Sequence, residues 1–365
     1  MNAFLVLADG RVFSGTSLGA QGTTIGEVVF STGMAGFQEN LTDPSYYGQI
    51  LTQTYPLVGN YGMNSQDGES GRVWARGYVV REACGVPSNF RSEMGLDEFL
   101  KQNGVVGIQG VDTRRLTRVL RGSGVMNGAI TTEYAPGNMD ELLGRVRAYA
   151  IRGAVPAVSC GVPQVYNEGG APHVALLDFG CTASLIQYLT KRCCKVTVLP
   201  GDTPPEQVRA LAPDGILLSN GPGDPAENSG LIRGLRTLLG YGIPTFGVCL
   251  GHQLAALAAG ARTEKLKYGH RGANQPVTDL ETGRTYITSQ NHGYTVVGDT
   301  LPAGMGRVSY VNANDGSCEG VEYTAWNCFT VQFHPDICGS SKDKELLFDR
   351  FIARMGARKG AQQNA

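Results

Sequence analysis

The chain of 365 residues lacks a large excess of charge of either sign. It carries 31 basic and 32 acidic residues, for a formal net charge of −1. No basic stripe or basic amphipathic segment stands out, so we expect neither nucleic acid nor a membrane as a partner. Long hydrophobic runs are missing too. No stretch approaches the roughly 20 apolar residues of a membrane span, and the apolar run 1–7 is too short for a signal peptide.

The nine cysteines lack the spacing of a disulfide framework or a zinc site. Their number is odd, Cys193 and Cys194 are adjacent, and no Cys-x-x-Cys occurs. Disulfide-rich secreted domains and structural zinc sites depend on regularly spaced pairs. We therefore expect no metal in this chain and a reduced, cytoplasmic setting.

The second half of the chain alternates strand-like and helix-like segments. Strand patterns occur at 173–179, 195–199, 215–219 and 243–248, with helix patterns between them at 183–192, 205–211 and 231–239. This alternation predicts an α/β domain with a mostly parallel sheet flanked by helices. In such sheets ligands bind at the carboxyl ends of the strands.

The first half has a different pattern. Its apolar runs are short and interrupted by glycine, which predicts a separate, strand-rich α+β domain. The segment 151–171 is rich in Gly, Pro and small residues and is typical of a linker. We thus expect an N-terminal domain at 1–150, a linker at 151–171, a second domain at 172–356 and a flexible tail at 357–365.

The segment Phe246–Gln253 has the pattern of a nucleophile elbow. Cys249 stands between Gly247 and Gly251, after an apolar run and before the small-residue helix pattern 250–259. Hydrolases place a serine at such a strand-to-helix turn. A helix N-terminus stabilises a thiolate, and its N–H groups can hold a developing oxyanion. The alternative is a buried structural cysteine at a tight turn.

A cysteine nucleophile needs a general base, and the chain has five histidines to offer. They are His173, His252, His270, His292 and His334. His334 follows the short alternating strand pattern 330–333, and Asp336 comes two residues later. This arrangement fits the base and the orienting carboxylate of a triad. The alternative is a turn residue before Pro335 with a capping aspartate.

With these motifs the chain resembles the class I glutamine amidotransferases. The resemblance rests on the elbow Phe246–Gln253 and on Gln-Phe-His-Pro at 332–335. It implies Cys249 as nucleophile, His334 as base and Asp336 as third triad member, which together convert glutamine to glutamate and ammonia through a thioester. The family carries glutamate where Asp336 stands. Because the third member contributes less than the nucleophile or base, we expect weakened but retained activity.

The resemblance covers nearly the whole chain and narrows to the small subunit of carbamoyl-phosphate synthetases. The segments that carry it are 26–38, 41–46, 54–62, 88–91, 110–114, 219–225, 269–274 and 289–293. Other glutaminase domains of this class lack the N-terminal half. The resemblance implies a glutaminase subunit that delivers ammonia for carbamoyl phosphate synthesis, in arginine and pyrimidine biosynthesis.

Carried over by position, the resemblance implies eight residues in contact with L-glutamine. They are Ser45, Gly221, Gly223, Leu250, Gln253, Asn291, Gly293 and Tyr294. The N–H groups of Gly221 and Leu250 would form the oxyanion hole. Tyr294 replaces a family phenylalanine, and a contact made by its backbone would leave the added hydroxyl with little effect.

The segment 178–185 departs from the family pattern. The family usually has lysine near Thr182 and asparagine near Ser184, and neither is present here. Together with Asp336 this departure leaves open a divergent, non-catalytic regulatory or scaffolding subunit of the same complex. A cysteine hydrolase that acts on another amide is a third hypothesis.

A phosphate-binding loop is also missing. Gly-x-x-x-x-Gly-Lys-Ser/Thr does not occur, nor does any Gly-Lys pair. We therefore expect no cofactor in this chain. The resemblance implies a large ATP-dependent subunit that binds ATP and Mg, in a heterodimer or higher assembly, with the N-terminal domain supplying much of the docking surface.

Overall fold

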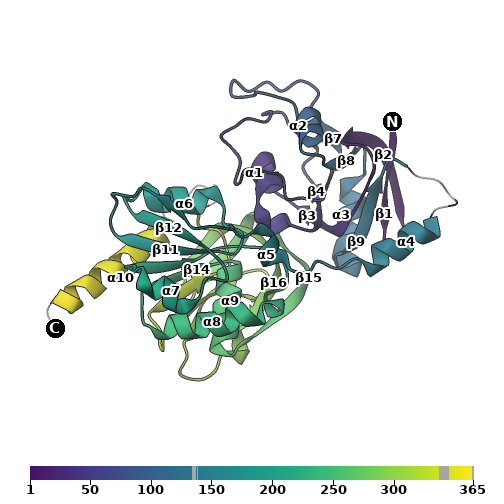
Figure 1. The fold of residues 1–365 in the computed structure, drawn as a ribbon. Coiled ribbons are helices and arrows are strands. Elements are labelled where there is room, and N and C mark those ends of the chain that lie inside the picture. The colour runs from purple at the N-terminus through teal and green to yellow at the C-terminus, as the bar shows by residue number, and fades with distance from the viewer. Residues whose placement is uncertain (134–136, 138, 337–344, 364–365) are drawn as a thin grey trace. The chain divides into compact units, whose positions relative to one another are not determined.

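The computed structural model describes residues 1–133, 137, 139–336 and 345–363. The chain forms two compact units, Met1–Arg152 and Gly153–Ala365 (Figure 1). The first unit thus ends close to the predicted boundary at residue 150. Among the described residues, no helix combines the length and the apolar character needed to cross a bilayer.

The first unit is a closed seven-stranded barrel. Its strand order is β1 (Asn2–Leu7), β2 (Val12–Gly19), β8 (Val106–Gln109), β6 (Gly77–Val79), β4 (Gln49–Gln53), β3 (Thr23–Ser31) and β9 (Met126–Thr131). Closure leaves no strand edge unpaired. Around the barrel lie α1 (Phe37–Thr42), α2 (Leu96–Gln102), α3 (Thr113–Ser123), α4 (Met139–Ala148), the 3-10 turn Pro44–Tyr46 and a small β5–β7 pair (Leu57–Val58, Glu82–Ala83). The prediction of a strand-rich α+β domain is confirmed.

The second unit is built on a ten-stranded sheet. Its central strands β12 (Lys195–Pro200), β11 (His173–Asp178), β13 (Gly215–Leu218), β14 (Thr245–Val248) and β19 (Cys328–Val331) are parallel. Successive residues of β11 face opposite cores: Ala175 packs on one side and Leu176 on the other. Burial on both faces explains why these strands are nearly continuous apolar runs.

Helices cover both faces of this parallel part. The helices α7 (Pro205–Ala210), α8 (Ser229–Gly240) and α9 (Leu250–Ala259) contribute to one core, and α6 (Ala183–Thr190) and α10 (Glu345–Gln363) to the other (Figure 1). The predicted α/β architecture of the second domain is therefore confirmed.

An antiparallel extension of the sheet was not predicted. Beyond β19 the order continues with β18 (Cys318–Tyr323), β16 (Thr285–Val297), β15 (Arg262–Asp279) and β17 (Arg307–Asn312). The strands β15 and β16 form a long hairpin whose pairing shifts twice, between Lys265 and His270 and between Gly272 and Gln275. Their polar, glycine-interrupted sequences carry no clear two-residue alternation, so periodicity did not reveal them.

The segments predicted as linker and tail both contain secondary structure. The predicted linker 151–171 contains α5 (Ala154–Val158) and β10 (Gln164–Tyr166), and β10 extends the sheet by pairing antiparallel with β12. The predicted tail 357–365 is helical as far as Gln363, because α10 continues to that residue. Glycine and proline content alone did not reveal either element.

Phe246 lies on β14, between the parallel strands β13 and β19. Its ring stacks on Phe329 of β19 with 4.6 Å between ring centroids, and it meets Phe348 of α10 edge-on at 5.6 Å. All three rings are buried. This aromatic cluster joins two strands and a helix directly below the predicted elbow.

Replacing Phe246 should therefore destabilise the second unit. We expect Phe246→Ala to lower the free energy of unfolding by about 3–5 kcal/mol, since it removes a buried ring and leaves a cavity. Phe90 is 95% exposed and offers a matched control; Phe90→Ala should change the free energy by less than about 0.5 kcal/mol. Urea unfolding followed by circular dichroism measures both. Equal effects of the two variants would contradict this packing.

Candidate active site

Cys249 connects β14 to α9 in a strained backbone conformation. Its φ of 54° and ψ of −104° lie outside the regions favoured by residues with a side chain. Such strain persists only where the surroundings enforce it, and a nucleophile elbow is a common case. The Cys249 N–H donates to the carbonyl of Val331, 2.9 Å away, which fixes the turn against β19.

The two glycines of the elbow are required by close packing. A Cβ on Gly251 would lie 2.4 Å from the carbonyl oxygen of Leu218. A Cβ on Gly247 would lie 2.8 Å from Cγ2 of Thr330. Any larger residue would push α9 away from the sheet and release the strained turn.

The thiol of Cys249 is buried at the start of α9. The side chain is 2% exposed, and Sγ lies 3.7 Å from the carbonyl oxygen of Asn291, to which the thiol donates. Asn291 belongs to β16, so the antiparallel extension forms one wall around the sulfur.

His334 lies three residues beyond the end of β19. The strand was predicted at 330–333, so β19 starts and ends two residues earlier than predicted. Its N–H donates to the carbonyl of Ser289 at 2.9 Å, and its side chain is fully buried. Within the described part of the chain, neither ring nitrogen has a hydrogen-bond partner. The bond to Ser289 fixes the backbone of His334 against β16.

The structure brings Cys249 and His334 to the same edge of the sheet. They follow neighbouring parallel strands, and Val248 is paired with Val331. Both also contact β16, since Sγ lies against Asn291 and the His334 N–H bonds Ser289. Ser289 and Asn291 are two residues apart on β16, so they are separated by about 7 Å and face the same side of the strand. The sulfur of Cys249 and the backbone of His334 thus both lie against β16.

Asp336 lies beside His334, as the sequence predicted. Its Oδ1 is 3.8 Å from Nδ1 of His334, which is beyond the roughly 3.2 Å of an N–H···O hydrogen bond. Its Oδ2 accepts a hydrogen bond from the hydroxyl of Thr182 at 3.0 Å. Both carboxylate oxygens are thus directed at polar groups. No pattern in the sequence indicated the contact with Thr182.

The two predicted oxyanion donors lie next to each other. Leu250 is the first residue of α9, where N–H groups have no acceptor within the helix. A Cβ on Gly221 would lie 2.1 Å from the carbonyl oxygen of Phe179 and 2.8 Å from Cδ2 of Leu250. Only glycine allows the loop after β13 to approach α9 this closely.

Three further predicted contacts line the same region. Gly223 has a φ of +89°, and a Cβ there would lie 2.7 Å from Cβ of Ala154. Gly293 and Asn291 are neighbours on β16, and a Cβ on Gly293 would lie 3.2 Å from the guanidinium of Arg271. Their contact with glutamine stays a prediction.

The side-chain amide of Gln253 is largely committed to the protein. Its Nε2 donates to the carbonyl of Tyr294 at 2.8 Å and to Oε1 of Gln332 at 2.9 Å. A ligand could therefore use only its Oε1. The Tyr294 carbonyl also accepts from Nδ1 of His292 at 2.7 Å, so this backbone group is already well satisfied.

Ser45 belongs to the first compact unit, unlike the other predicted site residues. It is buried in the 3-10 turn Pro44–Tyr46, where its N–H donates to Oδ1 of Asp43 at 2.8 Å. Its predicted contact with glutamine stays a prediction.

Three of the other histidines are engaged by neighbouring groups of the fold and have a lowered pKa. Burial lowers the pKa of His252 to about 3, and its Nδ1 bonds Oγ1 of Thr330. Burial also lowers the pKa of His292 well below its usual value, and the nearby positive charge of His270 adds to this. Burial lowers the pKa of His173, whose Nε2 bonds Thr197. All three are held neutral.

His270 belongs to a partly buried ion-pair network. Its Nε2 lies 2.9 Å from Oδ2 of Asp315, and its Nδ1 lies 3.6 Å from Oε1 of Glu319. His270, His292 and Glu319 could each offer an atom to a metal ion, within 4.8 Å of one another. The carboxylates of Asp315 and Glu319 and the Tyr294 carbonyl already engage these imidazoles. The cluster is therefore an ion-pair network.

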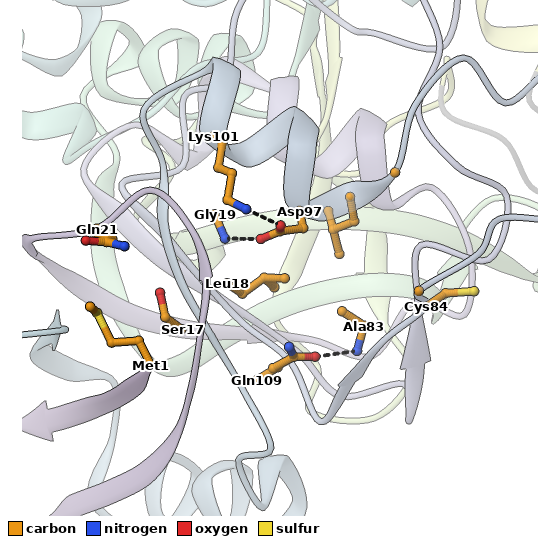
Figure 2. A pocket seen from close by; sticks show the side chains of 13 residues that line it. Met1, Ser17, Leu18, Gly19, Gln21, Ala83, Cys84, Asp97, Lys101 and Gln109 are labelled. Carbon is orange, nitrogen blue, oxygen red and sulfur yellow. Dashed lines mark hydrogen bonds and ion pairs between the residues drawn. The ribbon is translucent and has the colours of Figure 1, made fainter.

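A separate cavity of about 440 Å³ lies in the first unit, between β2, α2 and the chain around Ala83. Its polar groups bond one another: Asp97 accepts from the N–H of Gly19 and pairs with Lys101, and Gln109 accepts from the N–H of Ala83 (Figure 2). This cavity shows no nucleophile paired with a base among its described lining residues.

Comparison with known proteins agrees with this geometry. Residues 5–130 match the family described as carbamoyl-phosphate synthase small chain, CPSase domain, and residues 175–354 match glutamine amidotransferase class-I. The carbamoyl phosphate synthase small chain of Clostridium perfringens is 47% identical over 353 residues, covering 96% of this chain and 99% of that protein. The corresponding protein of Listeria monocytogenes serotype 4b is 45% identical over 361 residues, covering 99% of each.

The elbow and the matched domain define the second unit as a class I glutamine amidotransferase domain. The first unit and the full-length relatives narrow this further. The chain belongs to the carbamoyl-phosphate synthase small-chain family.

The His270 network should make stability depend on pH. Burial tends to lower the pKa of His270, but Glu319 and Asp315 together raise it above its usual value. Burial raises the pKa of Glu319 as well. The folded protein therefore binds more protons than the unfolded chain near neutral pH, so this stabilisation is full below about pH 6.5 and is lost as pH rises through the raised pKa of His270.

We accordingly expect the stability difference between the native chain and His270→Gln to shrink as pH rises above about 6.5. Urea unfolding of both proteins at a series of pH values measures it. His173→Gln serves as the control, because the pKa of His173 is lowered. A difference for His270→Gln that stays constant or grows with pH would contradict the assignment.

Proposed function

We propose that this chain is the glutamine-hydrolysing subunit of a carbamoyl-phosphate synthase and that Cys249 carries the reaction. The observation that carries this proposal is the strained, buried Cys249 at the start of α9, with the open imidazole of His334 on the neighbouring strand end. Membership of the small-chain family supports glutamine as the substrate.

The chemistry follows from these positions. Sγ of Cys249 transfers its proton to Nε2 of His334 and attacks the side-chain amide carbon of L-glutamine. The N–H groups of Gly221 and Leu250 hold the negative oxygen of the tetrahedral intermediate. His334 gives the proton to the departing nitrogen, which leaves as ammonia, and a thioester remains on Cys249. A water molecule that His334 deprotonates then releases glutamate and restores the thiol.

Asp336 orients the imidazole in this scheme and stabilises it while it is protonated. The gap of 3.8 Å to Nδ1 must close to form a hydrogen bond. Catalytic hydrogen bonds often shorten only when substrate is bound. In the free protein this gap weakens the interaction between Asp336 and His334. A reduced but real contribution of Asp336 to catalysis agrees with its side chain being shorter than the family's glutamate.

The ammonia goes to a large, ATP-dependent partner subunit. The relatives are named small chains, which supports a larger partner, and the absence of a Gly-Lys pair agrees with ATP and Mg being bound there. A sheltered path between the subunits would keep the ammonia unprotonated. The product, carbamoyl phosphate, would serve arginine and pyrimidine biosynthesis.

A non-catalytic regulatory subunit is not favoured, because the second unit matches a glutamine amidotransferase domain and the relatives are named carbamoyl phosphate synthase small chains. A glutamine analogue that alkylates thiols distinguishes the two candidates, because it should label Cys249 in the assembled complex only if the site is active.

Cys249→Ser should abolish glutamine-dependent synthesis of carbamoyl phosphate by the complex while synthesis from added ammonia persists. The hydroxyl of serine is a much weaker nucleophile here than the thiolate, whereas the partner's own chemistry is untouched. Both rates are measured on the same preparation. Cys193 is exposed and serves as the control; Cys193→Ser should leave both rates unchanged. Loss of both rates in Cys249→Ser, or of neither, would contradict the proposal.

A further inference from the structure

Thr182 occupies the N-cap position of α6 but does not cap that helix. Threonine at an N-cap usually accepts a hydrogen bond from an N–H in the first turn. No such bond is made by the Thr182 side chain. The residue is completely buried, so its hydroxyl needs a partner inside the protein.

The hydroxyl donates instead to Asp336. Oγ1 lies 3.0 Å from Oδ2 of Asp336 and 3.5 Å from Oδ1 of Asn220. A hydroxyl has one proton, and the closer, charged acceptor receives it. Because Thr182, Asp336 and His334 are all shielded from water, this bond is stronger than the same bond at the surface.

The bond helps to set how the carboxylate is turned. With Oδ2 bonded to Thr182, the other oxygen, Oδ1, faces Nδ1 of His334 at 3.8 Å. Loss of the bond would weaken this orientation. We propose that Thr182 is a positioning residue, which acts through Asp336 to hold the imidazole of His334 ready for proton transfer. This inference rests on the proposed glutaminase function.

The contact joins two departures from the family pattern that look unrelated in the sequence. Thr182 stands near the usual lysine, and Asp336 stands where the family has glutamate, 154 residues away. The hydroxyl of Thr182 is neutral, so it does not cancel the charge of the Asp336 carboxylate. The negative charge of Asp336 then remains available to stabilise the protonated His334.

The backbone of Thr182 has a separate role. Its N–H donates to Oδ1 of Asn220 at 3.3 Å, and Asn220 precedes Gly221 of the proposed oxyanion hole. A change of the side chain alone leaves this backbone link in place. Thr182→Val has nearly the same shape as threonine and therefore removes the hydroxyl selectively.

The test measures glutamine hydrolysis by the full-length chain with its large subunit. We expect Thr182→Val to lower kcat about ten- to a hundredfold, the effect of losing one hydrogen bond to a charged group, with KM changed less than about twofold. Thr182→Ser keeps the hydroxyl and should retain most of the activity. In an Asp336→Ala background, Thr182→Val should cause no further loss, since its target is gone.

Thr190 gives a control on the same helix, because its hydroxyl bonds the carbonyl of Gln187 and lies away from the site. Thr190→Val should leave kcat and KM unchanged. If Thr182→Val fails to fold, as judged by circular dichroism, Thr182→Ala in the same two backgrounds replaces it.

Several outcomes would overturn the inference. They are an equal fall in kcat in both backgrounds, a rise in KM at constant kcat, or a Thr182→Ser variant as inactive as Thr182→Val. Failure of the proposed function looks different: the native chain itself would release no ammonia from glutamine. The two failures are therefore distinguished in one experiment.

Discussion

The strained backbone of Cys249 is the constraint on which the rest of the site depends. A residue with a side chain held at positive φ costs about 1–3 kcal/mol, and the packing around it offsets this. Gly251 brings α9 against the carbonyl of Leu218, while the Cys249 N–H is tied to Val331. Because of this constraint the sulfur, the first N–H groups of α9 and the Gly221 loop converge on one point.

Burial then decides which imidazole can act as the base. His252 and His292 are as close-packed as His334, but each bonds a neighbouring group and burial lowers their pKa. His270 is tied to two carboxylates. His334 alone among these four has both ring nitrogens without a hydrogen-bond partner in the described chain. The surrounding histidines thus support the site without competing for its proton.

The antiparallel strand β16 organises the nucleophile and the base together. Its backbone carbonyls at Ser289 and Asn291 contact His334 and Cys249 respectively. Backbone contacts of this kind depend on strand register more than on side-chain identity. The same strand supplies Gly293 and Tyr294, so with Asn291 it carries three of the eight predicted glutamine contacts.

The sequence by itself determined the parallel sheet and the elbow, since both depend on short-range patterns: apolar strands alternating with helices, and glycines two residues either side of Cys249. It also indicated His334 and Asp336, which lie next to a strand. Only the tertiary structure decided the antiparallel extension, whose strands lack a clear alternation, and the bond from Thr182 to Asp336. That bond joins residues 154 apart, and such a separation leaves no local pattern, because the contact exists only once the sheet has formed.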